Sequence, residues 1–308
     1  MKPAVKKAMV AEFGASVTCD EVLAPLTTYR LGGPAAVVAR PSTVTELLAV
    51  GKVAASEHVE VLVVGRGSNL LVADSGFDGI VILLDRLAGA DRIDFRNNSV
   101  EVGAATALPV VARRTVAAGL TGFEWAVGVP GSIGGAVRMN AGGHGSDMAA
   151  VLDRVEVVDL SAGTQSWMPA AAVGLRFRGS DLTDHQVVLS AVLNLAPGDT
   201  STGEASLAEI VHWRREHQPG GQNAGSVFVN PVPGSVAAAQ LIDGLGLRGF
   251  RIGGAQVSEK HANFIQAGEG CTASDVRAVM EHVRRAVADA TGVVLRSEIR
   301  LAGFGDAE

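Results

Sequence analysis

Residues 128–145 read GVPGSIGGAVRMNAGGHG, and this glycine-rich run decides the expected fold together with a second run upstream. The second run, GRGSNLL at residues 65–71, follows the apolar, strand-like residues 61–64. Glycine adopts backbone angles that other residues avoid, so the main chain can approach a ligand closely. Either run alone is equally consistent with an ordinary turn. The pair, with its serines and asparagines, favours main-chain amides that bind a large anion such as a dinucleotide pyrophosphate.

Length and composition indicate a globular protein. A chain of 308 residues is long enough for two domains, and 47% hydrophobic with 19% charged residues is typical of a folded chain. The formal charge of −6 argues against nonspecific nucleic-acid binding. Two cysteines, Cys19 and Cys271, make neither a disulfide framework nor a metal cluster, and the histidines lack metal-ligand spacing. Without a signal peptide or an apolar membrane span, a cytoplasmic location is expected.

Hydrophobic periodicity predicts alternating helices and strands. Thr272 and Asp275 resemble a capping box for the last helix, and Gly292 suits its C-terminal stop. The composition of residues 195–206, rich in Gly, Ser and Thr, predicts a linker. The expected helices span residues 43–57, 107–118, 206–217 and 272–291, and the expected strands span 61–64, 80–84, 151–160, 187–195 and 293–301.

A Rossmann fold is the first alternative for the run at 65–71. This run follows a strand, and Asp85 lies about 20 residues further on, where a ribose-binding acid is expected. However, Leu70 replaces the third glycine of that motif. Residues 70–84 also alternate as strand, turn and strand, which leaves no room for the crossover helix. The Rossmann interpretation is therefore rejected.

Five motifs in order carry a family resemblance. They are GRGSNLL at 65–71, PGSIGGAVRMNAG at 130–142, RRE-x-QP with GSVF-x-NP between 214 and 231, RIGGAQVSEKHANF at 251–264 and LRSEIRLAG at 295–303. From about residue 27 to its last strand the chain resembles the UDP-N-acetylenolpyruvoylglucosamine reductases. The first two motifs are shared with a wider class of FAD-binding domains related to vanillyl-alcohol oxidase. The short spacing between Arg178 and the RRE-x-QP motif is similar to the shorter subtype of the reductases.

The resemblance implies an α+β flavoprotein. The expected ranges are an FAD-binding domain at 27–204 and an α+β substrate domain at 205–292. An N-terminal segment at 1–26 and a C-terminal strand and tail at 293–308 are expected to pack on the FAD-binding domain.

The resemblance also implies an activity, which is the NADPH-dependent reduction of UDP-N-acetylenolpyruvoylglucosamine to UDP-N-acetylmuramate through noncovalent FAD. Hydride adds to the vinyl carbon, negative charge develops beside the substrate carboxylate, and a proton completes the lactyl ether. Such chemistry needs a cation near the developing charge and a proton donor. The family's catalytic arginine, serine and glutamate correspond to Arg178, Ser226 and Glu298.

Binding roles are implied in the same way. His217 stands where relatives usually carry lysine, and Phe177 replaces a usual tyrosine, so a full positive charge and a hydroxyl are absent at those positions. The expected FAD-binding residues are Tyr29, Arg30, Gly65, Arg66, Gly67, Ser68, Asn69, Leu70, Pro130, Gly131, Ser132, Gly134, Gly135, Asn140, Ala141 and Gly142. The expected substrate-binding residues are Arg214, His217, Gln218, Asn230, Lys260 and His261.

Two other functions remain open at this point. One is a sugar or alcohol oxidase of the same fold; such enzymes often bind flavin covalently through His or Cys, and His144 is the only such residue near the glycine runs. The other is a non-catalytic flavin-binding subunit for electron transfer, which would not need Ser226 or Glu298. No obligate protein partner is evident from the sequence.

Overall fold

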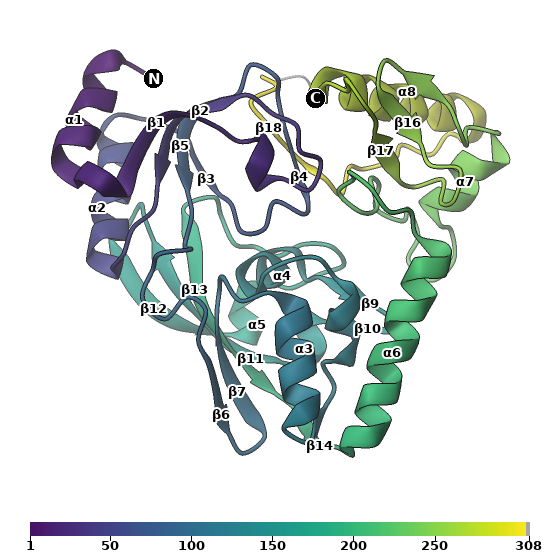
Figure 1. Cartoon of the computed structure of the whole chain (residues 1–308), viewed down its shortest axis with the longest axis horizontal. Helices are drawn as coiled ribbons and strands as arrows, with labels where there is room; N and C mark the ends of the chain where they lie inside the picture. Colours follow the sequence, from purple (N-terminus) through teal and green to yellow (C-terminus); the bar gives the residue numbers. More distant parts are fainter. Residues whose placement is uncertain (306–308) are drawn as a thin grey trace. The chain divides into compact units, whose positions relative to one another are not determined.

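The computed structural model describes residues 1–305 and divides into two compact units (Figure 1). Of these residues, unit 1 comprises 1–21, 35–66 and 78–213, and unit 2 comprises 22–34, 67–77 and 214–305. Each unit has its own cluster of buried apolar side chains. Both units are discontinuous in sequence, and the first glycine run is divided between the two units. The continuous ranges expected above, 27–204 for FAD binding and 205–292 for substrate binding, stay a prediction.

Unit 1 is built on two sheets. A five-stranded antiparallel sheet has the order β12-β11-β13-β7-β6, and a four-stranded sheet has the order β1-β2-β5-β3. The strands are β12 (Thr164–Pro169), β11 (Leu152–Asp159), β13 (Gln186–Asn194), β7 (Ser99–Gly103), β6 (Ile93–Arg96), β1 (Val17–Val22), β2 (Pro34–Ala39), β5 (Phe77–Ile82) and β3 (Val61–Val63).

Helices and short strands complete unit 1. Helix α4 packs against β13, and α3 packs against the 3₁₀ helix η3 (Glu124–Gly128). The α-helices are α1 (Pro3–Phe13), α2 (Val44–Ser56), α3 (Leu108–Ala117), α4 (Ile133–Met139) and α5 (Ala170–Val173). The short strands are β8 (Leu120–Thr121) with β14 (Ala196–Pro197), and β9 (Gly142–Gly143) with β10 (Ser146–Asp147).

Unit 2 combines a small sheet with one long helix. Helix α8 packs on the antiparallel sheet β15-β16-β17, and β18 pairs in parallel with β4. Helix α6 (Thr200–His217) runs from unit 1 into unit 2. The remaining elements are β4 (Leu70–Val72), α7 (Ala238–Gly244), β15 (Arg251–Ile252), β16 (Ala255–Val257), β17 (Ile265–Ala267), α8 (Ala273–Thr291) and β18 (Arg300–Ala302).

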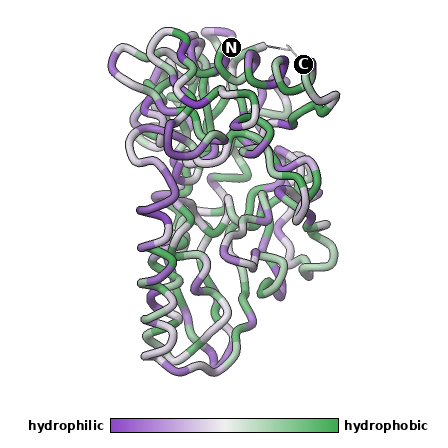
Figure 2. Tube along the Cα trace, turned by 90° about the vertical axis from the view of Figure 1, so that its right-hand side faces the viewer, coloured by the Kyte–Doolittle hydropathy of each residue, from purple (hydrophilic) through white to green (hydrophobic). Residues whose placement is uncertain are grey.

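The amphipathic pattern of α8 explains its position. Its whole apolar stripe is buried and consists of Val276, Val279, Met280, Val283 and Val287. The expected caps are also confirmed: the Thr272 side chain accepts a hydrogen bond from the Asp275 amide, and Gly292 ends the helix in the left-handed conformation at φ 73°. Apolar and polar stretches alternate along the whole trace (Figure 2), as expected where each element buries one face.

The predicted linker at 195–206 is wrong. Residues 196–197 form strand β14, and α6 begins at Thr200. The Asp199 carboxylate accepts hydrogen bonds from the Thr202 amide and hydroxyl, both at 2.8 Å, and so caps the first turn. Gly203 lies in the helix because Val116 leaves no room there: a Cβ would be 2.7 Å from Val116 Cγ1. Small residues in this segment therefore reflect close packing rather than flexibility.

Other expectations are confirmed with shifted bounds. Helices α2 and α3 and strands β3, β11 and β13 lie where periodicity placed them, and no helix follows residues 65–71, which confirms the rejection of the Rossmann fold. The final strand is shorter than predicted, since β18 begins only at Arg300. Helix α4, inside the second glycine run, was not anticipated. Among the described residues, no helix is both long and apolar enough to cross a membrane.

The left-handed stop of α8 can be tested with Gly292→Ala. An added Cβ meets no atom within 4 Å, so the backbone conformation alone should cost about 1–2 kcal/mol of unfolding free energy. Gly244→Ala is the matched control: it is also open, ends α7 at negative φ, and should be neutral or stabilising by about 0.4–1 kcal/mol. Denaturant midpoints of both variants provide the measurement. Equal midpoints would contradict the assignment.

Candidate functional site

The two glycine runs meet in unit 1 at Gly65 and Ser132. A Cβ added to Gly65 would lie 2.4 Å from the Ser132 hydroxyl oxygen. Ser132 is 3% exposed and is the N-cap residue of α4, and its main-chain oxygen accepts the Ala136 amide at 2.9 Å. The contact is possible only because residue 65 has no side chain. The structure therefore brings together two motifs that are more than sixty residues apart in sequence.

Several polar groups around these runs have no protein partner. The amides of residues 65–69 donate no hydrogen bond within residues 1–305. The hydroxyl of Ser132 has no partner in the same part of the chain, and the buried hydroxyl of Thr106, whose carbonyl accepts the Ile133 amide at 3.0 Å, has none either. A buried polar group without a partner, such as the Thr106 hydroxyl, is costly unless a ligand completes it, and the exposed amides of Gly65 and Arg66 are accessible to the same ligand. In unit 1, the donors of Gly65, Arg66, Ser132 and Thr106 fit a phosphate-bearing cofactor such as FAD.

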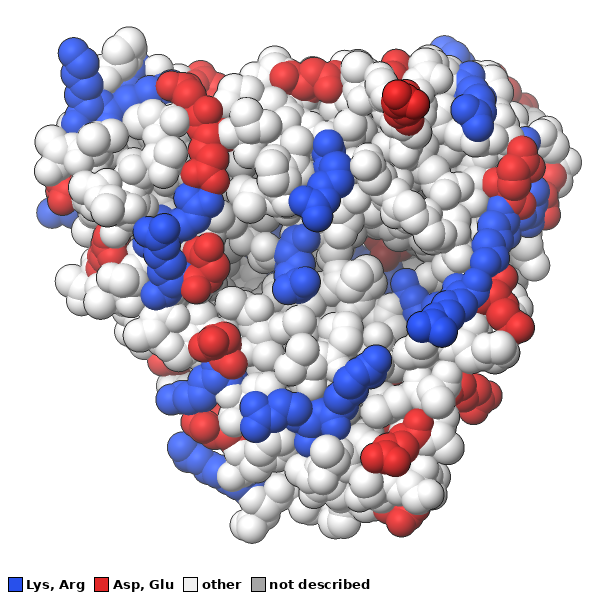
Figure 3. All heavy atoms as spheres, in the orientation of Figure 1, with Lys and Arg blue, Asp and Glu red and all other residues white. Residues whose placement is uncertain are grey.

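Charge at the first run supports the same ligand. Arg66 is exposed and makes no ion pair or hydrogen bond within residues 1–305. Over the visible face of the molecule, basic and acidic side chains are interspersed (Figure 3), and the overall charge is −6. Local cations rather than the protein's net charge must therefore attract an anionic ligand.

Arg178 is held against the end of the second run. It has φ 55°, its guanidinium donates to the Gly142 carbonyl at 3.0 Å, and it lies over the Phe177 ring at 5.2 Å. The positive φ is uncommon for a residue with a long side chain. Such a conformation persists only where neighbouring contacts hold it.

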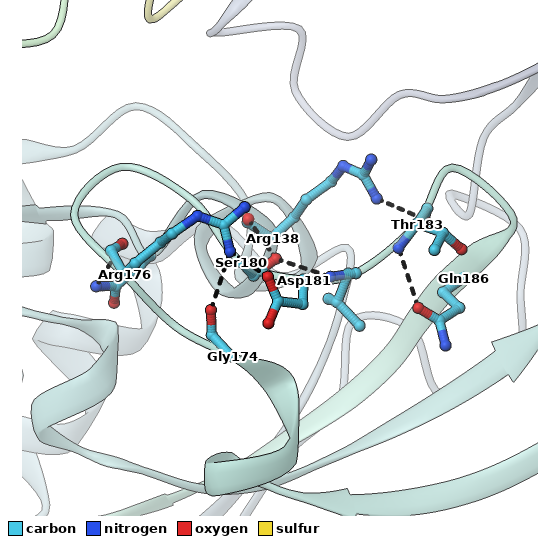
Figure 4. A network of polar contacts seen from close by, with 9 residues as sticks. Arg138, Gly174, Arg176, Ser180, Asp181, Thr183 and Gln186 are labelled. Atoms are coloured by element: carbon cyan, nitrogen blue, oxygen red, sulfur yellow. Dashed lines mark hydrogen bonds and ion pairs between the residues drawn. The ribbon is translucent and has the colours of Figure 1, made fainter.

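A polar network supplies those contacts (Figure 4). The Ser180 hydroxyl donates to the Arg138 carbonyl at 2.7 Å, and Arg138 donates to the Thr183 carbonyl at 2.8 Å. Arg176 forms an ion pair with Asp181. These bonds tie the loop that carries Arg178 to α4. The sequence motif alone did not reveal this support.

The Asn140 side chain is hydrogen-bonded within the protein. Its amide donates to Asp147 at 3.0 Å and to the Arg176 carbonyl at 3.2 Å, while its oxygen accepts the Ala149 amide at 2.9 Å. The residue is 3% exposed and ends α4 at φ 41°. The Asn140 side chain therefore holds the loop. Its amide hydrogens are already used within the protein, so the side chain has no donor left for the expected contact with FAD.

In unit 2, the segment 26–30 encloses Gly67. A Cβ there would lie 2.0 Å from the Leu26 carbonyl oxygen, and the Thr28 amide donates to the Gly67 carbonyl at 3.1 Å. Tyr29 is 0% exposed and its hydroxyl donates to the Ile265 carbonyl at 3.1 Å. Burial raises the pKa of this hydroxyl far above its usual value. The Tyr29 side chain therefore belongs to the core of unit 2, and the assignment of Tyr29 to FAD binding stays a prediction. Arg30 instead is exposed and donates to the Pro25 carbonyl at 2.8 Å.

Ser226 lies in an irregular segment that is bonded on both sides. Asn263, 4% exposed, accepts the Phe228 amide at 2.9 Å and donates to the Phe228 carbonyl at 2.8 Å. The main-chain oxygen of Asn263 also accepts the Val227 amide at 2.8 Å. The half-buried Ser226 hydroxyl has no partner within residues 1–305. Its backbone is fixed while its hydroxyl stays available, which suits a proton donor.

Glu298 lies on the chain paired with this segment. Its amide donates to the Val227 carbonyl at 2.8 Å, and the Val229 amide donates to the Arg296 carbonyl at 2.9 Å. The structure therefore brings the Ser226 and Glu298 segments together within unit 2. Arg178 belongs to unit 1.

Arg214 and Gln218 lie one helical turn apart at the end of α6. Burial lowers the pKa of the Arg214 guanidinium, which has no partner within residues 1–305. The buried side-chain oxygen of Gln218 also lacks a partner. A desolvated cation without a counter-charge is destabilising in isolation. The pair therefore indicates a site for an anionic, hydrogen-bonding ligand.

The other expected substrate residues have internal contacts. The Asn230 oxygen accepts the Ala238 amide at 3.1 Å at the start of α7. Lys260 is exposed and its ammonium donates to the Arg215 carbonyl near the end of α6. Burial, with a contribution from Arg248, lowers the pKa of His261, whose Nδ1 accepts the Asn263 amide at 3.2 Å. His217 is exposed in the last turn of α6.

A cavity of about 710 Å³ in unit 1 was not anticipated from the sequence. It lies among η3, the turn between β9 and β10, and α6, and its lining includes Glu124, Asp199 and Glu209 but no lysine or arginine. His144 also lines it and contacts the Trp213 ring edge-on at 5.0 Å. This acidic lining does not suit a pyrophosphate. Within residues 1–305, no cluster of three or more potential metal ligands is present.

Comparisons with known proteins identify two family regions. The sequence profile of an FAD binding domain matches residues 34–168, and that of the C-terminal domain of UDP-N-acetylenolpyruvoylglucosamine reductase matches residues 217–302. The chain is 41% identical to the UDP-N-acetylenolpyruvoylglucosamine reductase of Heliobacterium modesticaldum, over 92% of this chain and 90% of that protein. It is 36% identical to the Bacillus subtilis reductase, over 98% of this chain and 99% of that protein.

Solved structures agree with these matches. The crystal structure of the Thermus caldophilus reductase superimposes with a TM-score of 0.79 and 31% identity, covering 93% of this chain and 98% of that chain. A glucose dehydrogenase superimposes with a TM-score of 0.51 and 13% identity, covering 70% of this chain and 50% of that chain. The second match shows a shared fold alone.

The contact between the glycine runs can be tested with Gly65→Ala. The new methyl group would force the Ser132 hydroxyl to rotate, so FAD affinity should fall by about tenfold, or about 1.4 kcal/mol. Gly143→Ala is the matched control, because a Cβ there meets no atom within 4 Å and the position has no positive φ. Flavin titration of both deflavinated variants measures the effect. Equal affinities would show that this contact does not shape the cofactor site.

Proposed function

Because the chain belongs to the UDP-N-acetylenolpyruvoylglucosamine reductases, FAD-containing oxidoreductases of peptidoglycan precursor synthesis, we propose that it uses NADPH to reduce UDP-N-acetylenolpyruvoylglucosamine to UDP-N-acetylmuramate. The substrate combines a diphosphate, a sugar and an enolpyruvyl carboxylate. Its recognition therefore requires cations and hydrogen-bond donors in addition to a flavin site. A cytoplasmic location, expected from the sequence, remains part of this proposal.

The observation that carries the proposal is the unsatisfied pair Arg214 and Gln218. Both lie in the region matched by the reductase's C-terminal profile or directly beside it. The protein keeps a desolvated cation and a buried acceptor without internal partners at one helix end. An anionic substrate with hydroxyl and amide groups would satisfy both. A flavin-binding subunit that only transfers electrons would have no use for this arrangement.

Three residues of this chain are assigned to the chemical step. FAD held by the glycine runs would supply the hydride for the substrate, and NADPH would be the source of that hydride. Arg178, fixed by its loop network, places positive charge where the substrate's carboxylate gains electron density. Glu298 orients and polarises the enolic end of the substrate, and Ser226 delivers the proton that completes the product.

A serine can be the acid here because of what it protonates. The hydroxyl is a weak acid, but the carbon beside the carboxylate becomes strongly basic once hydride has been added. For proton transfer, a hydrogen-bond distance between the acid and the carbon that it protonates comes before the pKa of the acid. Asn263 and the chain at 296–298 fix the Ser226 segment from both sides, while the hydroxyl has no competing partner.

The two alternative functions gain no specific support. An oxidase with covalent flavin would need a nucleophilic His or Cys beside the cofactor, and His144 packs edge-on against Trp213 and lines the acidic cavity. The glucose dehydrogenase match concerns the fold alone. Denaturation that releases free FAD is the direct test against a covalent link.

Ser226→Ala tests the proton donor. Loss of a positioned general acid typically slows its step by about 10²–10⁴-fold. Oxidation of the reduced enzyme by UDP-N-acetylenolpyruvoylglucosamine should slow by this factor, whereas flavin reduction by NADPH should be nearly unchanged. Anaerobic stopped-flow absorbance follows the two half-reactions separately. A variant whose second half-reaction stays within a factor of about three of wild type would remove Ser226 from this role.

Arg214→Met tests the substrate site through two opposite effects. Loss of a charged hydrogen bond should raise the KM for the UDP-sugar by about 10- to 100-fold. Removal of a desolvated, unpaired charge should at the same time leave unfolding stability equal or higher. The exposed neighbour Arg215→Met is the control and should change neither quantity. A destabilised Arg214→Met with normal KM would indicate a structural arginine instead.

A further inference from the structure

Asn69 has a use in the structure that its motif did not suggest. The family resemblance places it among the FAD-binding residues of the first glycine run. In unit 2, however, its side-chain amide donates a hydrogen bond of 2.9 Å to the main-chain carbonyl of Glu298. Its own main-chain oxygen accepts the Arg300 amide at 3.0 Å. One residue therefore bonds the chain on both sides of Ile299.

The location of these bonds is important. Strand β4 starts at Leu70 and pairs in parallel with β18 from Arg300. Asn69 stands directly before this pairing and extends it to Glu298 through a side chain. The Glu298 carbonyl lies beyond the end of the β4–β18 ladder, so the Asn69 side chain supplies a hydrogen bond that the ladder does not. The opposite side of Glu298 is fixed by its amide, which donates to the Val227 carbonyl at 2.8 Å.

Only an amide side chain suits this position. The Glu298 carbonyl is an acceptor and needs a donor, which asparagine supplies and aspartate, when ionised, cannot. Aspartate has almost the same size, so replacing asparagine by aspartate removes the donor and sets two acceptors against each other. Serine keeps a donor on a shorter side chain.

We propose that Asn69 is a positioning residue for Glu298: its side chain holds the main chain from which the Glu298 carboxylate projects, rather than serving as a contact to FAD. This inference rests on the proposed role of Glu298 in the reaction. A displacement of about 1 Å in a reacting group can cost about 10²-fold in rate. A single hydrogen bond that prevents such a displacement therefore has a measurable effect on one half-reaction.

The first experiment separates positioning from cofactor binding. Asn69→Asp should slow oxidation of the reduced enzyme by UDP-N-acetylenolpyruvoylglucosamine by about 10- to 100-fold. Both half-reactions are measured with saturating FAD, because a carboxylate beside the main-chain amides of residues 65–69 can weaken cofactor binding by charge alone. Flavin reduction by NADPH should then change much less than oxidation by the substrate, because Glu298 has no role in flavin reduction. Asn69→Ser should recover part of the lost rate. Asn98→Asp, an equal charge change at an exposed asparagine of unit 1, is the control and should behave as wild type.

The second experiment asks whether Asn69 acts through Glu298. In a Glu298→Gln background the main-chain carbonyl remains, but the carboxylate that it positions is gone. Adding Asn69→Asp to that background should cost less than about threefold more, so the two effects should be strongly non-additive.

Each contrary result has its own meaning. A rise in the FAD dissociation constant for both Asn69→Asp and Asn69→Ser, with slower NADPH reduction, would overturn positioning in favour of a cofactor contact. A full additional loss in the Glu298→Gln background would also overturn it. If Glu298→Gln alone reacts at the wild-type rate, the proposed role of Glu298 fails first, and the positioning role fails with it. If Glu298→Gln is slow but Asn69→Asp is not, only the positioning role fails.

Discussion

The hydrogen bond from the Glu298 amide to the Val227 carbonyl is the interaction on which the candidate chemistry in unit 2 depends. It joins two segments far apart in sequence, one carrying Ser226 and the other Glu298. Neither segment lies in a long strand, where successive ladder hydrogen bonds would fix the backbone. Each instead relies on one asparagine: Asn263 holds the chain after Ser226, and Asn69 holds the carbonyl of Glu298. Side-chain amides thus replace sheet ladders where the backbone is irregular.

Sequence patterns predict those elements whose signals are local. The last helix is confirmed in its stripe, its capping box and its terminal glycine because each of these depends on residues only a few positions apart. The glycine runs are also local signals and predict the FAD-binding domain, and the five motifs in order predict the family that the comparisons show. The failures occur where tertiary contacts decide. The segment 195–206 has the composition of a linker, yet Gly203 is required by Val116, which is distant in sequence.

The same distinction between local sequence signals and tertiary contacts applies to the site residues. The motifs single out candidate residues, but a motif match does not say which atom of a residue would contact a ligand. Asn140 lies in the second glycine run and Tyr29 near the start of the family resemblance, yet the Tyr29 hydroxyl is bonded within the core of unit 2 and the Asn140 amide shapes the loop beside α4. The support of Arg178 by Arg138 and Ser180 could not be inferred, since no periodicity relates residues forty positions apart.

Hydrogen-bond accounting offers a physical criterion where motif matching ends. Polar groups that the protein already satisfies, such as the amides of Asn69 and Asn263, belong to the scaffold. Buried or partly buried groups left unsatisfied, such as the Arg214 guanidinium and the Gln218 oxygen, lower stability unless a ligand completes them. Their presence together at one helix end is the observation from which we propose that a ligand binds there. This criterion separates polar groups that the protein itself satisfies from polar groups that are left for a ligand, a distinction that sequence similarity by itself cannot make.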